Sequence, residues 1–276
     1  MPPKSAKFQS EGTASDLKKN RYGLGSHFGA ERCWQMVGHP AAFTDNQGLG
    51  ALVADIRFDA EIGRLATAPI AFPRRVGGQI SGDVFGTLKI DLFGRWFADA
   101  AACGLEEHTA CALATAAADG RPSCRMVLLK EHGKSGFVFY TNLESPKARD
   151  LAENPQAELC FHWMPLKRQV RIHGPVEPVE PEVADAYFAT RPRLSQVGAW
   201  ASHQSQPMRR PYDLEKNVMA TAARYGFGKV PRPPHWSGFR LRAESIEFWM
   251  EKPFRQHHRI RFRRKDDGWL KERLFP

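Results

Sequence analysis

The stretch ACALATAAADGRPSCRMVLLK (110–130) decides the fold that we expect for this chain. Two apolar runs flank Asp119-Gly120, a dipeptide typical of the tight turn that joins two antiparallel strands. GFVFYTN (136–142) follows as a third run of strand-forming residues. Three neighbouring strands without an intervening helix argue against alternating βαβ units and indicate an antiparallel sheet.

The same patterns continue toward the C-terminus. Further strands are expected in AELCFHW (157–163), RQVRIHGPVEPV (168–179), GFRLRAESIEFWM (238–250), RIRFRR (259–264) and GWLKERLF (268–275). Helical spacing is found in DLFGRWFADAAACG (91–104), SPKARDLAENP (145–155), PEVADAYFATR (181–191) and DLEKNVMATAARYG (213–226). Asp91 and Ser145 are candidate N-caps, and the turn from Lys265 to Gly268 predicts a C-terminal hairpin. The sequence therefore predicts a mainly β protein, a small β-barrel with peripheral helices.

Composition narrows the class of protein. The 276 residues are 42% apolar and 11% aromatic, ample for a packed core, and the net charge of +10 favours anionic partners. The five cysteines are odd in number and form no C-x-x-C pair, so they suggest neither a disulfide framework nor a metal site, and a reducing compartment fits best. No apolar run approaches the roughly 20 residues of a membrane span, and the start MPPKSAKFQSEG lacks the apolar stretch of a secretory signal. We therefore expect a cytoplasmic protein that does not bind a membrane.

The first ninety residues differ from the rest in pattern. Residues 1–90 are rich in Gly, Pro and Ala with weak periodicity, so we interpret them as an N-terminal extension that is in part disordered. Residues 91–276 form the patterned domain. Within the extension, GLGSHFG (23–29) has its third glycine one place too late for a dinucleotide-binding loop and follows no predicted strand, which argues against a nucleotide site.

Several basic residues interrupt the apolar strands. Arg125 and Lys130 flank the apolar run MVLL, and Gln169 follows two cations where another strand begins. A cation at a strand end is most often a solvated terminus. Lys147 differs, because a cation in the first turn of a helix opposes the helix dipole unless an anion lies near both.

A second group of polar residues surrounds the end of the helix predicted at 181–191. Tyr187 and Arg191 are four residues apart and share a helix face, and Ser195 follows Pro192, which ends the helix. Hydroxyl and guanidinium donors that converge at a helix end suit a phosphate. An amphipathic helix with a solvated arginine is the alternative interpretation.

The stretch RQHHRIRFRR (255–264) is the most basic part of the chain. Taken as a strand, it places Arg255, His257, Arg259, Arg261 and Arg263 on one face. Such a face can meet water, a polyanion or one compact anionic ligand, and the stretch alone does not decide among them. The predicted hairpin partner argues against a loose basic tail.

Taken together, these blocks resemble the pyridoxamine 5′-phosphate oxidases. In that family's order and spacing, from about Asp91 to Pro276, the chain contains RMVLLK, FVFYTN, SPKA, RQVRIHG, YFATRPRLSQVGAWAS, QSQP, PPHWSGFRL, IEFW and RQHHRIRF…W…RLFP. The resemblance implies an FMN-binding split β-barrel homodimer. It also implies oxidation of pyridoxamine 5′-phosphate or pyridoxine 5′-phosphate to pyridoxal 5′-phosphate in vitamin B6 metabolism, with O2 as electron acceptor and H2O2 as by-product.

The resemblance also implies the residues of the site. The family's FMN ligands fall on Arg125, Met126, Val127, Leu128, Lys130, Tyr140, Thr141, Lys147, Gln169, Gln204, Ser205, Trp249 and Arg259. Its substrate-phosphate ligands fall on Lys130, Tyr187, Arg191 and Ser195. Arg255 and His257 match the catalytic pair that holds the pyridine ring and its reacting carbon against the flavin.

The chain departs from the family at several positions. Pro146 replaces an arginine or similar residue, Met250 a glutamine and His258 an aspartate, while LKKNRYG (17–23) only loosely matches a basic arm that closes over the substrate. These departures favour, as an alternative, a non-catalytic flavin or pyridoxal-phosphate binding protein of the same fold. A basic nucleic-acid-binding protein is a further alternative, although the sequence contains no zinc finger, KH loop or RRM signature. We expect no nucleic-acid partner.

Overall fold

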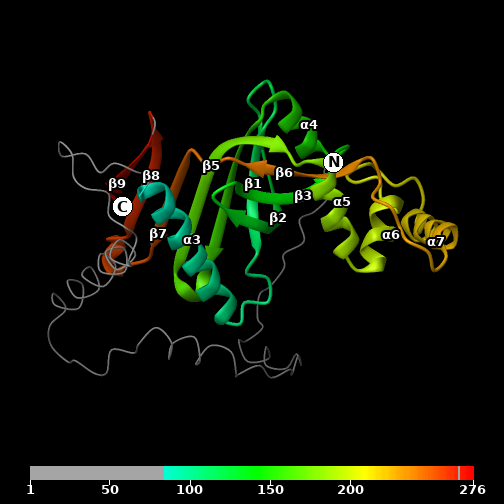
Figure 1. Cartoon of the computed structure of the whole chain (residues 1–276), viewed down its shortest axis with the longest axis horizontal. Helices are drawn as coiled ribbons and strands as arrows, with labels where there is room; N and C mark the ends of the chain where they lie inside the picture. The colour runs from blue at the N-terminus through cyan, green and yellow to red at the C-terminus, as the bar shows by residue number, and fades with distance from the viewer. Residues whose placement is uncertain (1–83, 267) are drawn as a thin grey trace, which may run out of the picture.

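The computed structural model describes residues 84–266 and 268–276 (Figure 1). Within these residues the strands are β1 (Ala110–Ala116), β2 (Pro122–Gly133), β3 (Gly136–Asn142), β4 (Gln156–Trp163), β5 (Arg168–Pro178), β6 (Trp236–Leu241), β7 (Ser245–Met250), β8 (His258–Lys265) and β9 (Gly268–Leu274). The α-helices are α3 (Val84–Ala102), α4 (Pro146–Glu153), α5 (Pro181–Thr190), α6 (Arg193–Ala201) and α7 (Asp213–Tyr225). Two short 3₁₀ turns are η1 (Met164–Leu166) and η2 (Pro253–Arg255).

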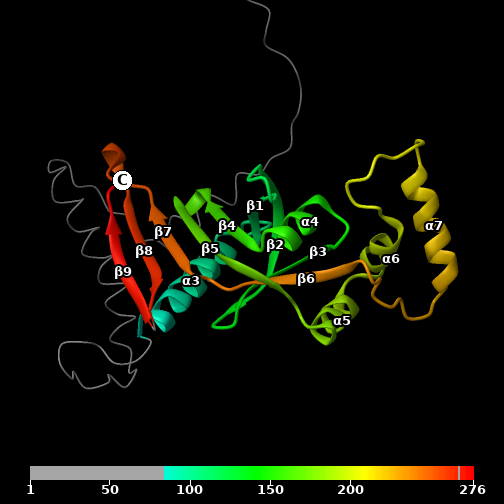
Figure 2. The same cartoon turned by 90° about the horizontal axis from the view of Figure 1, so that it is seen from above.

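The strands form one antiparallel sheet that closes into a barrel and then continues beyond it. The order is β4-β1-β2-β3-β6-β5-β7-β8-β9, and an additional pairing between β4 and β5 closes the first six strands. The strands β7, β8 and β9, which we call the flap, extend from the barrel at β5. Figure 2 shows the flap at one end of the molecule, the barrel in the middle and helices α5, α6 and α7 at the other end.

The long strand β5 pairs with the barrel strand β6 along one part of its length and with the flap strand β7 along another. Its C-terminal end, from Val176 to Pro178, pairs with β6, whereas its first half, from Arg168 to His173, pairs with β7. Gly174 lies between these two halves. A Cβ atom there would lie 2.0 Å from the carbonyl oxygen of Arg242, so only a glycine lets the chain cross from β6 to β7 at this point.

Helix α3 supplies a large part of the core. Leu92, Phe93 and Trp96 are fully buried, and the Phe93 ring makes edge contacts with Phe137 of β3 and Phe161 of β4. These residues have the apolar helical spacing that the sequence predicted. Helix α3 begins earlier than expected, however, so Asp91 lies inside it and the N-cap prediction is wrong.

Most other elements match the prediction from sequence. The three strands around Asp119-Gly120, the hairpin from Lys265 to Gly268 and the helix after Ser145 are confirmed. Helix α6 was not predicted, because Pro192 was taken as the end of a helix without a second helix following it. The expected strand at 238–250 is two strands, β6 and β7, separated at the crossing beside Gly174.

Some predictions concern residues outside the described part of the chain. The proposed boundary at residue 90 falls within α3, whereas GLGSHFG (23–29) and LKKNRYG (17–23) lie outside the described residues. Cys103, which directly follows α3, is disulfide-bonded, while Cys111, Cys124 and Cys160 are free thiols. Among the helices that the structure describes, none combines the length and apolar character that a membrane crossing needs.

Candidate active site

A cavity of about 700 Å³ lies between the barrel edge and the helices α5 and α6. Its lining includes most of the residues expected to bind a cofactor or a phosphate, namely Met126, Val127, Leu128, Lys130, Tyr140, Thr141, Lys147, Tyr187, Arg191, Ser195 and Gln204. Positions from five parts of the chain therefore meet in one cavity. The lining residues that the sequence analysis missed are Asn142, Thr190, Pro192, Gly198, Ala199, Ser202 and Trp236.

The missed residues of helix α6 had a detectable signal. Gly198 and Ala199 follow the predicted Ser195 by three and four residues, so these small residues lie on one helix face, which faces the cavity, and Ser202 follows at the C-cap. Gln196 holds the corner between α5 and α6, because its side-chain amide donates hydrogen bonds to the carbonyl oxygens of Phe188 and Arg191 at 3.1 and 3.0 Å. The Phe188 carbonyl also accepts from the backbone amide of Arg191 at 3.2 Å, so Gln196 adds to the hydrogen bonds at the end of α5.

Lys130 lies beside a β-bulge at the edge of the cavity. Leu129 pairs with Phe139 and Glu131 with Val138, so Lys130 is an extra residue in β2 with no partner in β3. Leu128 and Lys130 are two residues apart in β2, so they share a face of the strand, and both line the cavity.

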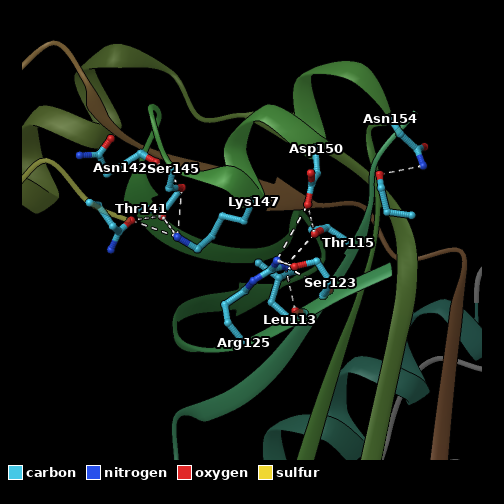
Figure 3. Close-up of polar contacts among 12 residues, drawn as sticks. Leu113, Thr115, Ser123, Arg125, Thr141, Asn142, Ser145, Lys147, Asp150 and Asn154 are labelled. Carbon is cyan, nitrogen blue, oxygen red and sulfur yellow. Dashed lines mark hydrogen bonds and ion pairs between the residues drawn. The ribbon is translucent and has the colours of Figure 1, made fainter. Parts of the chain in front are cut away.

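Lys147 is a buried cation surrounded by neutral oxygens. Its Nζ donates hydrogen bonds to Thr141 Oγ1 at 3.0 Å, Ser145 Oγ at 3.1 Å and Gln204 Oε1 at 3.0 Å (Figure 3). Burial, together with the positive charge of Arg125, lowers the pKa of Lys147 to about 8. No carboxylate among the described residues forms an ion pair with Lys147, so the site would gain from an anionic ligand.

Arg125 lies beside the cavity and is bound to the barrel wall. Its Nη1 donates to Thr115 Oγ1 at 2.7 Å and to the carbonyl of Leu113 at 3.2 Å, and Asp150 Oδ2 lies 3.9 Å from Nη2 (Figure 3). Thr115 donates in turn to Asp150 at 2.7 Å. Arg125 is not part of the cavity lining, and its clearest effect there is electrostatic, through Lys147.

Aromatic rings form one wall of the cavity. The Tyr140 ring stacks on Tyr187 at 4.1 Å and on Trp236 at 5.2 Å between centroids. The guanidinium carbon of Arg191 lies 4.7 Å from the centre of the Trp236 ring. Gly238 makes room for the stack, because a Cβ atom there would lie 2.7 Å from Tyr140 Cδ1.

Arg191 is the second cation of this cavity. Its Nη1 is buried and has no hydrogen-bond partner among the described residues, and burial lowers the pKa of its guanidinium. Burial also raises the pKa of Tyr187, whose hydroxyl therefore stays protonated at neutral pH. A buried guanidinium with an unused donor beside a neutral tyrosine suits a phosphate group.

The remaining predicted site residues form a second cluster on the flap. Gln169 of β5 pairs with Trp249 of β7, which pairs with Arg259 of β8, so the three form a row across neighbouring strands. Arg259 Nε donates to Glu247 Oε1 at 2.9 Å, and the His257 ring lies 4.7 Å from the Trp249 ring. Strands β7 and β8 lie at the end of the molecule opposite α5 and α6 (Figures 1 and 2).

The basic stretch 255–264 is not one strand, so the single cationic face predicted from sequence is wrong. Strand β8 begins at His258, while Phe254 and Arg255 have positive φ values of 57° and 60° around the turn η2. Only Arg259, Arg261 and Arg263 alternate within the strand. Arg255 is exposed, and His257 is fixed by the backbone amide of Lys252, which donates to its Nδ1 at 3.3 Å. Because Nδ1 accepts, a neutral His257 ring carries its proton on Nε2.

Ser205 completes the set of predicted residues. It follows Gln204 in the loop between α6 and α7 and has a positive φ of 66°. Its side chain is exposed, and it does not line the cavity. The structure thus places Ser205 and Arg125 next to the cavity, and Gln169, Trp249, Arg255, His257 and Arg259 on or near the flap.

The closed barrel and the strands that extend from it define a split-barrel protein, and the cations Lys130, Lys147 and Arg191 line its cavity. Residues 97–226 match the family model described as pyridoxamine 5′-phosphate oxidase. Residues 236–276 match the model of the pyridoxine 5′-phosphate oxidase C-terminal dimerisation region. The chain belongs to the pyridoxamine 5′-phosphate oxidase family, which confirms the resemblance seen in the sequence.

Individual relatives agree with this membership. The chain is 57% identical over 187 residues to a pyridoxine/pyridoxamine 5′-phosphate oxidase from Maricaulis maris, a match covering 67% of this chain and 84% of the relative. It is 54% identical to the protein of that name from Azorhizobium caulinodans, covering 67% and 88%. Among solved structures, PhzG from Burkholderia lata in complex with tetrahydrophenazine-1-carboxylic acid superposes with a TM-score of 0.65 at 32% identity, covering 68% of this chain and 92% of PhzG.

Proposed function

We propose that this protein oxidises pyridoxamine 5′-phosphate or pyridoxine 5′-phosphate to pyridoxal 5′-phosphate, with FMN as cofactor and O2 as electron acceptor. Family membership at 57% identity supports the activity. The observation that carries the proposal in the structure is a pair of cations in one cavity, the buried Lys147 and the half-buried Arg191, whose Nη1 atom is buried without a hydrogen-bond partner among the described residues. Cofactor and substrate are both phosphate esters, so a site that holds them together needs two separate sets of cationic donors.

The residues around Lys147 fit the phosphate of FMN. Lys147 would exchange part of its contact with neutral oxygens for a charged partner, and Thr141 and Gln204 supply further polar groups within 3.5 Å of each other. Met126, Val127 and Leu128 of β2 line the same cavity, and the side chains of Met126 and Leu128 are exposed. When bound, FMN supplies the two-electron oxidation and O2 takes up the electrons, giving H2O2.

The residues around Arg191 fit the phosphate of the substrate. Arg191 has an unused buried donor, Tyr187 a protonated hydroxyl, and Ser195 lines the same cavity from the first turn of α6. Lys130, which lines the cavity beside the bulge of β2, adds a fourth donor and a second charge. We assign these four residues to the phosphate and Arg255 with His257 to the pyridine ring.

The flap residues require a second subunit in this proposal. Trp249 and Arg259 belong to β7 and β8, which lie at one end of the molecule, whereas α5 and α6, which line the cavity, lie toward the other end. The match of residues 236–276 to a dimerisation region supports a homodimer. We infer that the flap of one subunit completes the cavity of the other, which makes two equivalent sites per dimer.

Spectroscopy and turnover together test the proposed function. The purified protein is expected to show flavin absorbance, to release FMN on denaturation, and to consume O2 while it forms pyridoxal 5′-phosphate from either substrate. A colourless protein that binds duplex or single-stranded nucleic acid with strong salt dependence would overturn the proposal. A yellow protein that binds pyridoxal 5′-phosphate without turnover would support the non-catalytic alternative.

We further propose that residues 1–83 are dispensable for the barrel and for flavin binding. Helix α3 packs its Leu92, Phe93 and Trp96 into the core, so the shortest domain should retain that helix. A protein that begins at residue 84 is expected to remain a folded, flavin-loaded dimer. Loss of flavin in this shortened protein, measured by absorbance after gel filtration, would show that the first residues belong to the oxidase domain.

A further inference from the structure

We infer that Trp236 is a positioning residue that holds the Arg191 guanidinium in place for the substrate phosphate. The inference rests on the proposed function, because it assigns Arg191 to a phosphate ester. Trp236 was not among the residues expected from the sequence. It acts on the substrate through Arg191, so it is distinct from the phosphate ligands themselves.

The surroundings of Arg191 give it few other constraints. Arg191 follows the last residue of α5 in an extended conformation, so the helix does not fix its side chain. No ion pair to Arg191 occurs among the described residues, and its Nη1 has no hydrogen-bond partner there. Its guanidinium carbon lies 4.7 Å from the Trp236 ring centre and 5.5 Å from that of Phe188. Aromatic faces are therefore the main contacts that orient this cation.

An aromatic contact is suited to this task. A guanidinium that lies over a ring is attracted by the ring's quadrupole and uses none of its five N–H donors in doing so. A carboxylate would orient Arg191 as well, but it would occupy those donors and repel the phosphate dianion. The indole thus fixes the position of the cation and leaves its hydrogen-bonding capacity for the ligand.

Trp236 is itself rigidly held. It is 7% exposed, stacks on Tyr140 at an interplanar angle of 4°, and packs edge-on against Phe188 at 5.1 Å. Arg232 Nη1 donates to the Trp236 carbonyl at 2.8 Å, which ties down the first residue of β6. Its neighbour on the same strand face, Gly238, is the position that leaves room for Tyr140. A ring fixed on several sides can in turn fix the cation above it.

A double-mutant cycle tests this role. The four proteins are wild type, Trp236→Leu, Arg191→Ala and the double variant, and the measurement is the Kd of the flavin-loaded protein for pyridoxal 5′-phosphate. Trp236→Leu is expected to weaken binding about tenfold in the wild-type background, as for a desolvated cation–π contact. In the Arg191→Ala background it should change the Kd by less than about twofold, because the cation it positions is absent.

Kinetics and a conservative variant separate positioning from a merely structural role. In Trp236→Leu the KM for pyridoxamine 5′-phosphate should rise about tenfold while kcat stays close to wild type, which is the pattern of lost uniform binding. Trp236→Phe keeps an aromatic face and should recover most of the affinity. If Trp236→Leu does not fold, Trp236→Phe still allows the cycle to be measured. Equal weakening by Trp236→Leu with and without Arg191 would overturn the inference.

A matched control is available on the flap. Trp269 of β9 also lies beneath a cation, with Lys89 Nζ 3.7 Å from its ring centre, but it is outside the cavity. Trp269→Leu should leave the Kd for pyridoxal 5′-phosphate unchanged, and an equal loss there would contradict a specific role for Trp236. The same double-mutant cycle measured with inorganic phosphate distinguishes the inference about Trp236 from the proposed oxidase function. Coupling with phosphate in a protein that does not oxidise the substrates would refute the proposed function and retain the inference.

Discussion

Lys147 and Arg191 in the cavity, and Arg259, Arg261 and Arg263 on the flap, carry the same charge in very different surroundings. Lys147 is buried and contacts neutral oxygens, and the half-buried Arg191 contacts aromatic rings. Each of these three flap arginines lies within ion-pair distance of a carboxylate, Arg259 of Glu247 and the other two of Glu272.

This difference in surroundings indicates which positive charges of a basic protein are available to a ligand. Burying a cation without an anionic partner costs free energy, so such a cation is expected where a ligand restores the balance. Arg261 and Arg263, which are already paired with Glu272 across the β8–β9 hairpin, have no such need. The net charge of +10 is therefore a poor guide to the site, while the local pairing of each cation is a good one.

The largest effect that would test this contrast is expected at Lys147. Lys147→Met removes the charge and keeps the length of the side chain, so the flavin phosphate loses a buried, charge-assisted contact of about 1.5–3 kcal/mol, or about ten- to more than a hundredfold in affinity. Titration of the apoprotein with FMN measures this loss. Arg261→Met, which removes a flap cation of similar size, is the control and should leave the FMN affinity unchanged.

The next effect concerns Arg255 and His257, which we assign to the substrate. Arg255→Ala and His257→Ala should each lower kcat/KM for pyridoxamine 5′-phosphate by about tenfold or more, because each loses a direct polar contact with the substrate. Both proteins should remain flavin-loaded. Arg263→Ala should match wild type in both measurements, and a uniform mild effect across the three variants would mean that the basic stretch is a solvated surface.

The FMN affinity of the apoprotein is expected to depend on pH through the protonation of Lys147. Its pKa is lowered to about 8 in the ligand-free protein, so the charge is present below that pH and is lost above it. Binding a phosphate dianion above pH 8 then requires proton uptake, and the affinity of the apoprotein for FMN should fall by up to about tenfold per pH unit. In Lys147→Met this fall should disappear, since the titrating group is gone.

The lowered pKa of Lys147 also affects the folding stability of the apoprotein. A rise in pH weakens FMN binding but should increase this stability. The pKa of Lys147 in the folded protein is below its usual value of 10.5, so the unfolded chain binds more protons between about pH 8 and that value. The stability of the apoprotein should therefore gain from this residue as the pH rises through that window. Denaturant unfolding at pH 8 and pH 10, compared between wild type and Lys147→Met, measures the contribution.

The smallest effect is expected on the flap surface. Hydrogen bonds from Arg261 and nearby positive charge lower the pKa of Glu272, so its favourable pairing is present at neutral pH and is lost as the pH falls through its folded pKa. The pair is exposed, and exposed pairs contribute little. Glu272→Gln should change the Tm only slightly and leave FMN affinity as in wild type. A marked loss of flavin in this variant would assign the Glu272 pairs to the site.

The sequence predicted the barrel well because its signals are local. The Asp119-Gly120 turn and the strand alternation of β1, β2 and β3 depend on neighbouring residues, and the structure follows them. The start of α3 was missed because Leu88 and Lys89 are buried by long-range packing, which no capping signal marks. The break between β6 and β7 likewise depends on the contact of Gly174 with Arg242, residues distant in sequence.

The site was predictable only in part for a related reason. Alternation along residues 255–264 assumed a continuous strand, but the left-handed residues Phe254 and Arg255 turn the chain before β8 begins. The role of Trp236 had no local signal, since an aromatic residue before a strand most often belongs to the core. Its contact with Arg191 joins β6 to the end of α5 and becomes visible only in three dimensions.

The distance between the cavity and the flap row has a genetic consequence. If each site takes its cavity from one subunit and its flap from the other, a chain damaged at Lys147 and a chain damaged at Trp249 are each inactive alone. In a mixed dimer both defects fall in one site, and the other site is entirely wild type. Random pairing of equal amounts would restore about a quarter of all sites, so two null alleles would complement each other.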